Sequence, residues 1–413
     1  MYYSNKSSQQ YFLNTKFFIA IKLYFFISII LIINCTSSKE VLVVHRDNNQ
    51  NALIKIYIQY PDKQVIKPFT IRGEGVPGLN WDRGIELDHL DDNLWGIEIY
   101  NITKTSSKIK FKTLLKDELW QLGNNYIIDV TNATNEFTFY PWFHTKSGTI
   151  KIFKNIYSKE LNNTRSIAFY LPPKYYENPF SILRNILLMN DGNNIFNVSC
   201  STCCPNGCWF CEDTLNTLIV NGDIKDDLLV VGIYNTALRM EEYTYSKDPT
   251  YGGGKAELYL DFIESTIIPF MVKTFNTNHR LEASYSLGIL GSSLGGLLSC
   301  YAGQTRPHVY DYAGCMSSSF WWNNKDFNSI ILKNGTTTRK SSSAFYLDSG
   351  NEGPGKDDEM ETIGVRESME RLGKKINTNL FYYLDDGGSH NELFWGKRFF
   401  RPMIDFYHEE GRE

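Results

Sequence analysis

A serine between two glycines is the position in this chain most suited to covalent chemistry. Ser293 lies in the pattern Gly291-x-Ser293-x-Gly295, after the apolar stretch 287–290 and before the apolar residues 297–298. A strand, a sharp turn and a helix would project the serine hydroxyl out of a sheet, and glycines permit the close backbone approach that this turn requires. The pattern therefore predicts a nucleophilic serine on a strand-to-helix turn.

A nucleophilic serine needs a base that accepts its proton and a carboxylate that orients the base. Among the seven histidines, only His390 follows a strand-like stretch, residues 380–384, and lies in a turn, residues 387–392. Hydrolases present the base in a loop at the carboxyl edge of the sheet, so we predict His390 as the base.

The acid is expected in the loop that follows another strand-like stretch, residues 344–350. We predict Asp358 as the residue that orients His390, with Asp357 as the second choice and Glu352 as the third. The resulting order of serine, aspartate and histidine along the chain is that of α/β-hydrolases.

Two backbone N–H groups are needed to stabilise the oxyanion that forms when a serine attacks an acyl group. One is expected from Leu294, the residue that follows the nucleophile. The second is expected from the loop after the apolar stretch 186–189, where Asn193 and Gly192 are the candidates.

The elements that must position these residues occupy the second part of the chain, residues 150–411. Buried strand-like runs at 186–189 and 228–233 alternate with helical stretches, of which 256–275 and 363–374 are the clearest. This alternation predicts the α/β class, with a mostly parallel central sheet that helices cover on both faces.

Residues 40–145 have a different pattern. Short apolar strands alternate there with turns, and no amphipathic helix interrupts them. This spacing predicts an all-β antiparallel sandwich. The boundary between the two domains is expected near residues 141–148.

Composition and the N-terminal residues indicate the cellular setting. The 413 residues carry a formal net charge of −4, which offers no basic field for nucleic acid.

Residues 1–38 contain lysines followed by an apolar-rich run at 23–33, which predicts a signal peptide; an uncleaved signal anchor over 17–33 is the alternative. We expect a protein that is secreted or lies in the lumen of the secretory pathway and does not engage the membrane after signal cleavage. Sequons of the N-x-Ser/Thr type also favour export, and they begin at Asn101, Asn132, Asn162, Asn197 and Asn334.

Cysteines are concentrated in an insertion at residues 198–213, which holds Cys200, Cys203, Cys204, Cys208 and Cys211. Behind a signal peptide this cluster predicts a disulfide-stapled loop, with one cysteine paired elsewhere or free. A four-thiolate zinc site is the alternative. Cys300 and Cys315 fall in expected core elements and are interpreted as buried thiols. No metal ion or organic cofactor is expected.

Residues 165–407 resemble the esterase family that includes enterochelin esterase, feruloyl esterases, S-formylglutathione hydrolase and mycolyltransferases. The matching motifs lie at 168–175, 190–192, 239–244, 291–296, 317–322 and 389–392, together with Trp395. The resemblance implies an α/β-hydrolase fold with Ser293 as nucleophile and His390 as base, whereas the acid loop matches less well.

Three residues from these motifs, Trp321, Trp322 and Arg239, are candidates for lining the substrate pocket. The alternative is core packing for the tryptophans and an ion pair with Glu242 for Arg239.

The first domain resembles a starch-type carbohydrate-binding module, through residues 78–82, 94–95, 110–112 and 119–125. By that resemblance Trp81, Lys112 and Trp120 form a sugar platform, since indole faces stack on pyranose rings and a lysine donates to hydroxyl groups. The alternative is that both tryptophans pack inside the sandwich or against the hydrolase domain.

These features together predict a secreted serine carboxylic-ester hydrolase that works through an acyl-enzyme. Its expected substrate is a small-molecule or glycan-linked ester, and a polysaccharide is the candidate partner of its first domain. An acyltransferase that uses the same residues and a non-catalytic glycan-binding protein are the alternatives.

Overall fold

The computed structural model describes residues 54–61, 68–99, 108–130, 135–198, 207–334 and 342–408. The expected signal segment, the sequons at Asn101 and Asn132, and Cys200, Cys203 and Cys204 lie outside these ranges. Residues 52–413 form one compact unit.

Two small sheets form the first part of this unit. One has the strand order β4-β5-β1-β9, and the other has the order β3-β2-β6-β7, with β8 also paired to β6. The strands are β1 (Ile54–Gln59), β2 (Phe69–Glu74), β3 (Ile85–Glu86), β4 (Asp88–Asp91), β5 (Leu94–Ile99), β6 (Lys108–Leu115), β7 (Leu119–Trp120), β8 (Tyr126–Asp129) and β9 (Glu136–Phe139).

Strand pairing in this region is antiparallel except between β1 and β9, which are parallel. The prediction of a purely antiparallel arrangement is therefore wrong for this pair. Two strands joined by a short hairpin must pair antiparallel. Strands β2 to β8 lie between β1 and β9 in the chain, so β1 and β9 can pair in parallel. The two sheets share one hydrophobic cluster, in which the rings of Phe69 on β2 and Trp95 on β5 lie 4.7 Å apart.

An eight-stranded mixed sheet forms the second part, in the order β10-β11-β13-β12-β16-β17-β18-β19. The last six strands in this order are parallel, whereas β10 and β11 are antiparallel to their neighbours. The prediction of a mostly parallel central sheet is confirmed. The strands are β10 (Thr149–Ser158), β11 (Asn163–Leu171), β12 (Leu183–Met189), β13 (Leu228–Ile233), β16 (Leu281–Ser292), β17 (Tyr312–Met316), β18 (Ala344–Gly350) and β19 (Leu380–Asp385).

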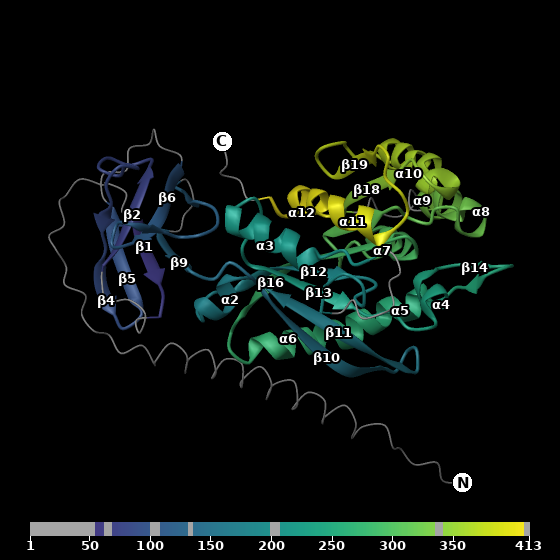
Figure 1. The fold of residues 1–413 in the computed structure, drawn as a ribbon, viewed down its shortest axis with the longest axis horizontal. Coiled ribbons are helices and arrows are strands. Elements are labelled where there is room, and N and C mark those ends of the chain that lie inside the picture. The colour runs from purple at the N-terminus through teal and green to yellow at the C-terminus, as the bar shows by residue number, and fades with distance from the viewer. Residues whose placement is uncertain are drawn as a thin grey trace, which may run out of the picture. The chain divides into compact units, whose positions relative to one another are not determined.

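Helices cover both faces of this sheet, because alternate residues of its buried strands enter two different clusters. Ile186 and Leu188 of β12 join the cluster that contains residues of α5, α6, α7 and α10. Leu187 and Met189 of the same strand join the cluster that contains residues of α3, α11 and α12. In Figure 1, α3, α11 and α12 lie on one side of the strands, and α5 and α6 lie on the other.

The helices and short elements of this part have the following bounds: α2 (Lys174–Glu177), α3 (Cys211–Asn221), α4 (Arg239–Tyr243), β14 (Lys247–Asp248), β15 (Gly252–Gly253), α5 (Ala256–Phe262), α6 (Ile268–Asn276), α7 (Leu294–Thr305), α8 (Trp322–Asp326), α9 (Leu332–Asn334), α10 (Glu359–Arg371), α11 (Glu392–Arg398) and α12 (Phe400–Tyr407). A π-helical turn, Ile263–Ile267, joins α5 to α6, so the predicted helix at 256–275 is continuous.

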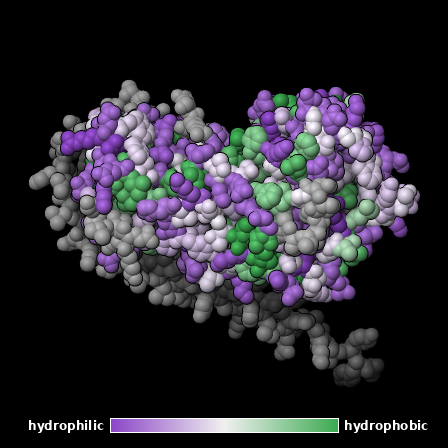
Figure 2. Space-filling model, viewed as in Figure 1, coloured by the Kyte–Doolittle hydropathy of each residue, from purple (hydrophilic) through white to green (hydrophobic). Residues whose placement is uncertain are grey.

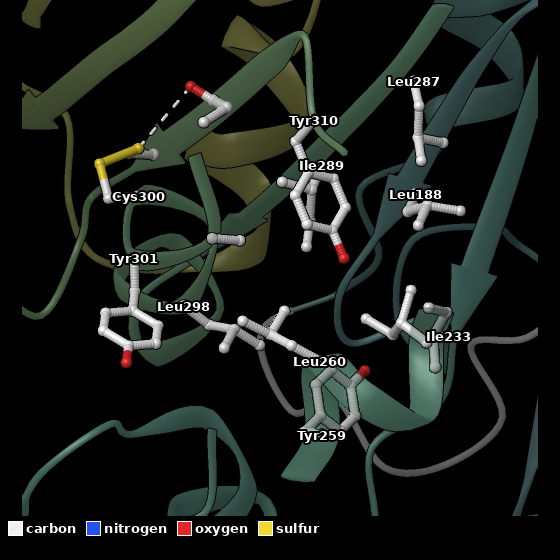
Figure 3. Close-up of a cluster of buried hydrophobic side chains, with 14 of the residues drawn as sticks. Leu188, Ile233, Tyr259, Leu260, Leu287, Ile289, Leu298, Cys300, Tyr301 and Tyr310 are labelled. Carbon is white, nitrogen blue, oxygen red and sulfur yellow. Dashed lines mark hydrogen bonds between the residues drawn. A yellow bond between two sulfur atoms is a disulfide. The ribbon is translucent and has the colours of Figure 1, made fainter. Parts of the chain in front are cut away.

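A disulfide joins Cys300 of α7 to Cys315 of β17 inside the first of these two clusters (Figure 3). The interpretation of both residues as buried thiols is wrong. Helix α7 packs directly on β17, and this tertiary contact brings two cysteines that are 15 positions apart into bonding range.

In the cysteine-rich insertion, Cys208 is disulfide-bonded and Cys211 is a buried free thiol. A disulfide sulfur is not a thiolate ligand, so Cys208 does not fit the alternative four-thiolate zinc site.

Glu177 of α2 ties the two parts of the compact unit together. Its carboxylate accepts hydrogen bonds from the backbone N–H groups of Phe143, His144 and Thr145, at 2.6 to 3.2 Å, and from the hydroxyl of Tyr60 at 3.0 Å. Because this carboxylate is buried, the segment that links the two parts is held by charge-assisted bonds rather than left as a free linker.

The surface of the compact unit mixes polar and apolar side chains. The face in Figure 2 has separate hydrophobic patches among hydrophilic residues. Within the described ranges, none of the helices has the length and apolar character needed to span a membrane.

Candidate active site

Ser293 occupies a strained turn between β16 and α7. Its backbone angles are φ 58° and ψ −127°, in a region that side-chain-bearing residues rarely occupy. A side chain at Gly291 would clash with the turn, because its Cβ atom would lie 2.7 Å from the backbone of Gly295. A Cβ atom on Gly296 would lie 2.8 Å from the carbonyl oxygen of Met316. The predicted strand, turn and helix are all present at this position.

The backbone and the hydroxyl of Ser293 contact the end of β17 and the loop after it. Its N–H group donates to the carbonyl oxygens of Met316 and Ser317, at 3.1 and 3.2 Å. Its hydroxyl lies 3.3 Å from the hydroxyl of Ser319. Among the described residues, this hydroxyl forms no hydrogen bond with His390.

His390 contacts Asp357, the second choice for the acid. Its Nδ1 atom lies 2.5 Å from Oδ1 of Asp357, whose side chain is fully buried. The ring of Trp395 packs edge-on against the imidazole, with the ring centres 5.0 Å apart. The histidine is therefore oriented by a buried carboxylate on one side and an indole on another.

The prediction that Asp358 orients His390 is wrong. Lys356, Asp357 and Asp358 have φ values of 49°, 50° and 55°, and this left-handed run turns the Asp357 side chain inward. Asp358 stands at the N-cap position of α10, and Glu352 is exposed; neither hydrogen bonds to His390 in the described structure.

The pKa values of the two neighbouring aspartates are shifted in opposite directions. Burial by itself raises the pKa of Asp357, but contacts from His390, Ser317 and the N–H group of Gly350 outweigh it and leave the pKa below its usual value. Burial, reinforced by the nearby Glu361, raises the pKa of Asp358 to about 6. Asp357 is therefore the carboxylate that stays ionised beside the imidazole.

The loop after β12 lies against the start of α7, where oxyanion donors were expected. The side-chain N–H group of Asn190 donates to the carbonyl oxygen of Gly295 at 3.1 Å. Leu294 is the first residue of α7, so its N–H group has no partner within the helix. The N–H group of Gly192 is committed to Ile233 at 2.8 Å, which removes this candidate. The N–H group of Asn193 has no acceptor in the described part of the chain.

Arg239 holds this loop and does not serve as a free pocket residue. Its guanidinium makes a two-point ion pair with Asp191, at 2.7 and 2.8 Å, while Asn235 and Tyr243 contact the same aspartate. The predicted alternative, an ion pair with Glu242, is also wrong, because that carboxylate pairs with Arg165 at 2.9 Å.

The two tryptophans after the serine loop have different environments. Trp322 is fully buried, and its Nε1 donates to the carbonyl oxygen of Ser246 at 3.1 Å, so its assignment to the pocket is wrong. Trp321 is 37% exposed and packs edge-on against the exposed ring of Tyr251. Trp321 follows Ser319 by two residues and is the tryptophan available to a ligand.

In the first part of the unit, Trp81 and Trp120 form a stacked pair with ring centres 6.4 Å apart and an interplanar angle of 27°. Trp120 is exposed, and the guanidinium of Arg72 lies over its ring at 5.4 Å. Lys112 differs from its predicted role, because its ammonium group donates to the carbonyl oxygens of Gln121 and Gly123. Burial lowers the pKa of Lys112, and the cation beside the indoles is Arg72.

Several residues that surround the candidate triad were missed at the sequence level. Ser317 donates to Asp357 at 2.6 Å and accepts from Nε1 of Trp395 at 2.9 Å. Asp348 and Arg398 form a buried ion pair beside them. The family motifs include Ser317 and Trp395, so these two positions carried a signal, whereas no motif marks Asp348 or Arg398.

Comparisons with known proteins identify the family of this chain. The sequence pattern of the family described as "Putative esterase" matches residues 158–406. An uncharacterized protein YbbA of Bacillus subtilis is 24% identical over 267 residues, which cover 62% of this chain and 97% of that protein. A siderophore triacetylfusarinine C esterase of Aspergillus fumigatus is 40% identical over 73 residues, or 17% of this chain and 23% of that protein.

Among solved structures, the enterobactin esterase of Shigella flexneri is similar with a TM-score of 0.47 and 14% identity, over 87% of this chain and 94% of that one. The family match covers more than half of the sequence and includes every residue of the candidate site. The chain belongs to this esterase family and is a carboxylic ester hydrolase.

Proposed function

We propose that this chain is a serine esterase in which Ser293 is the nucleophile, His390 the base and Asp357 the acid. The Ser293 oxygen forms a bond to the ester carbonyl carbon while its proton moves to Nε2 of His390. Collapse of the tetrahedral intermediate breaks the bond to the alcohol oxygen, which takes the proton from His390. Water then attacks the acyl-enzyme by the same proton transfers and releases the acid and free Ser293.

The observation that carries this proposal is the contact of 2.5 Å between His390 and the buried Asp357, in a protein that also holds a serine in a strained turn. A carboxylate on Nδ1 fixes the tautomer that leaves Nε2 free to accept a proton. The hydroxyl of Ser293, now beside Ser319, must rotate toward His390 when substrate binds. Catalytic hydrogen bonds often form only in that complex.

We assign the oxyanion to the N–H groups of Leu294 and Asn193. The first is left unpaired by the helix start, and the second lies in the loop that Arg239 and Asn190 hold against α7. Donors that are fixed before the reaction are worth more than mobile ones, because no reorganisation is needed as charge develops.

Hydrolysis of p-nitrophenyl acetate tests this assignment. We expect Ser293→Ala and His390→Ala to lose at least about 1,000-fold in kcat. Ser265→Ala, which removes a hydroxyl on the surface turn between α5 and α6, is the matched control and keeps wild-type turnover. Labelling by a fluorophosphonate should map to Ser293 alone. Equal slow turnover by wild type and Ser293→Ala would contradict the proposal and favour a binding protein.

The substrate class is proposed as a small-molecule or glycan-linked ester. One matched relative is named as an esterase of a siderophore, which supports a small-molecule ester. Trp321, two residues after Ser319, packs with the exposed Tyr251 into an aromatic surface, and such a surface suits an apolar or aromatic part of the substrate.

We further propose that the protein works in an oxidising, secretory setting. The buried disulfide between Cys300 and Cys315 and the disulfide of Cys208 support this, since disulfides persist mainly outside the cytosol. Asn162 and Asn197 are exposed, as glycan acceptors must be. Expression in a secreting host should give a medium-borne protein whose mass falls on N-glycosidase treatment. Retention inside the cell without glycan would contradict this.

A second candidate function, glycan binding by the two small sheets, is supported by the stacked pair Trp81 and Trp120. The flat, exposed indole of Trp120 suits a pyranose ring, and Arg72 with its partner Asp117 places hydrogen-bonding groups beside the pair. Trp120 is exposed and Trp81 is half-buried, so the pair presents an indole face to a ligand as well as packing on itself.

Retention on insoluble starch tests the second function separately. Trp120→Ala should abolish retention, whereas Tyr157→Ala, which removes an exposed aromatic ring on β10, should not. Neither variant should alter turnover of p-nitrophenyl acetate. Retention of Trp120→Ala at the wild-type level would rule out this surface as a sugar platform.

A further inference from the structure

Arg398, the last residue of α11, is a buried cation behind the candidate triad. Its side chain is only 3% exposed, and it faces three carboxylates. Nε lies 3.0 Å from Oδ2 of Asp348, Nη2 lies 3.5 Å from Oδ2 of Asp357, and Nη1 lies 3.1 Å from Oδ2 of Asp385. A buried arginine and its acids are expensive to desolvate, so this cluster depends on well-placed ion pairs and hydrogen bonds.

Asp348 is the strongest of these partners and connects Arg398 to the nucleophile side of the site. It accepts a bond from Nη2 of Arg398 at 3.1 Å and from the N–H group of Ser317 at 2.9 Å. The carbonyl oxygen of the same Ser317 accepts from the N–H group of Ser293. Arg398 and Asp348 therefore fix the loop on which the nucleophile turn rests.

Ser317 also links Arg398 to the acid. Nη2 of Arg398 donates to the Ser317 hydroxyl, and that hydroxyl donates in turn to Oδ2 of Asp357. Asp357 thus receives a direct ionic contact and a hydroxyl-mediated one from the same guanidinium on its Oδ2 atom. Its Oδ1 atom is left to His390.

We propose that Arg398 is a positioning residue of the esterase site, which holds Asp357 ionised and aimed at His390 through a direct contact and through Ser317. The inference rests on the proposed triad. Planar guanidinium geometry is required, since three separate N–H directions are used at once and an ammonium group has no such fixed fork.

The charged and titratable groups that face this arginine come from every element around it. They are Tyr346 and Asp348 on β18, Asp357 before α10, and Asp385 at the end of β19. His390 contacts Asp357 and also interacts electrostatically with Asp358. Among the described residues, Arg398 is the only arginine or lysine in direct contact with Asp357.

Removal of the Arg398 charge has a defined effect on the pH profile. Without a cation beside it, Asp357 is harder to ionise and stabilises protonated His390 more strongly when it is ionised. Both changes move the acidic limb of kcat/KM to higher pH. If Arg398 only filled space, its substitution would lower the free energy of unfolding without moving this limb.

The test uses three variants of the full chain and p-nitrophenyl acetate. Arg398→Gln tests the whole role. Arg398→Gln with Asp348→Asn removes the charge pair together, so that no unpaired acid is left in the core. Arg398→Lys keeps a positive charge and loses the fork. We expect each to lower kcat by about 10- to 100-fold with KM within about two-fold of wild type.

The acidic limb should move upward by about 0.5 to 1 pH unit in Arg398→Gln, by less in the double variant because it also loses the Asp348 anion, and stay in place in Arg398→Lys. Arg306→Gln is the matched control, because Arg306 also bridges three carboxylates, Glu257, Asp261 and Glu264, but outside the site. It should lower the melting temperature and leave kcat and the pH profile unchanged.

Wild-type kcat in the folded double variant would overturn the inference, since Arg398 would then only neutralise Asp348, and so would an unshifted limb in Arg398→Gln. Wild-type kcat in Arg398→Lys would overturn it too. If Ser293→Ala keeps activity, the proposed function itself fails; if Ser293→Ala is inactive and the Arg398 variants are normal, only this inference fails.

Discussion

Nδ1 of His390 lies 2.5 Å from Oδ1 of Asp357, whereas Asp358, the next residue, makes no hydrogen bond to the imidazole in the described structure. Substitution of Asp357 therefore tests the acid role, and substitution of its neighbour Asp358 is the control. Asp357 is fully buried and ionised by its contacts; Asp358 has its pKa raised to about 6 by burial and a neighbouring acid.

Asp357→Asn should lower kcat by roughly 1,000- to 10,000-fold, because an amide on Nδ1 favours the wrong tautomer of His390. Asp358→Asn should stay within about three-fold of wild type, since it breaks no contact with the ring. Steady-state kinetics with p-nitrophenyl acetate measures both. A larger loss in Asp358→Asn than in Asp357→Asn would return the acid role to Asp358.

The turn at Ser293 was predictable because its requirements are local. Gly291 and Gly295 flank Ser293; a Cβ atom on Gly291 would lie 2.7 Å from the backbone of Gly295, and one on Gly295 would lie 3.1 Å from Asn190. The parallel sheet was predictable for a related reason: strands buried on both faces must be continuously apolar, as residues 228–233 are.

The choice between Asp357 and Asp358 was not predictable by the same reasoning. It depends on a left-handed run from Gly355 to Asp358, and sequence spacing does not reveal which side chain such a run turns inward. Arg398 lies 41 positions after Asp357, so its contact exists only because α11 packs beside β18 and β19. The pairing of Cys300 with Cys315 likewise depends on where α7 lies on β17.

Asp358 should make stability depend on pH in the direction opposite to that of a salt-bridged acid. Its pKa is higher in the folded state than the ordinary value of 3.8, so the folded state binds the proton more tightly and loses relative stability as pH rises from about 4 to about 6. Asp358→Asn removes this penalty. The variant should gain on the order of 1 kcal/mol at pH 8, after allowance for solvent screening, and progressively less as pH falls below 6.

Urea unfolding at pH 4.5 and pH 8 measures this difference. Glu352→Gln, an exposed position in the same loop, is the control and should change the free energy of unfolding at neither pH. A gain for Asp358→Asn that is equal at both pH values would show that its ionisation is not the cause.

The disulfide between α7 and β17 should contribute substantially to stability. It closes a loop of 15 positions, for which the loss of chain entropy in the unfolded state corresponds to about 3 kcal/mol. Cys300→Ala with Cys315→Ala should therefore lower the free energy of unfolding by about 2–4 kcal/mol under oxidising conditions. Cys211→Ala, which removes a buried thiol that is not bonded, should cost about 1 kcal/mol.

Addition of a reductant separates the two effects. Reduction should destabilise the wild type by more than it destabilises the Cys300 and Cys315 double variant, because the latter has lost this bridge already. Equal sensitivity of both proteins would mean that the bridge between α7 and β17 does not form in solution.

Arg239 is expected to act on turnover and not on substrate affinity. Its two-point ion pair with Asp191 fixes the loop that presents the N–H group of Asn193, and it does not line a pocket with a free guanidinium. Arg239→Gln should lower kcat by about 10- to 100-fold, because a loosened donor stabilises the oxyanion less, and leave KM within about two-fold. A pocket-lining arginine would instead raise KM while kcat persisted. The matched control is Arg366→Gln, which removes a guanidinium that lies over the ring of Tyr382 and should alter neither constant.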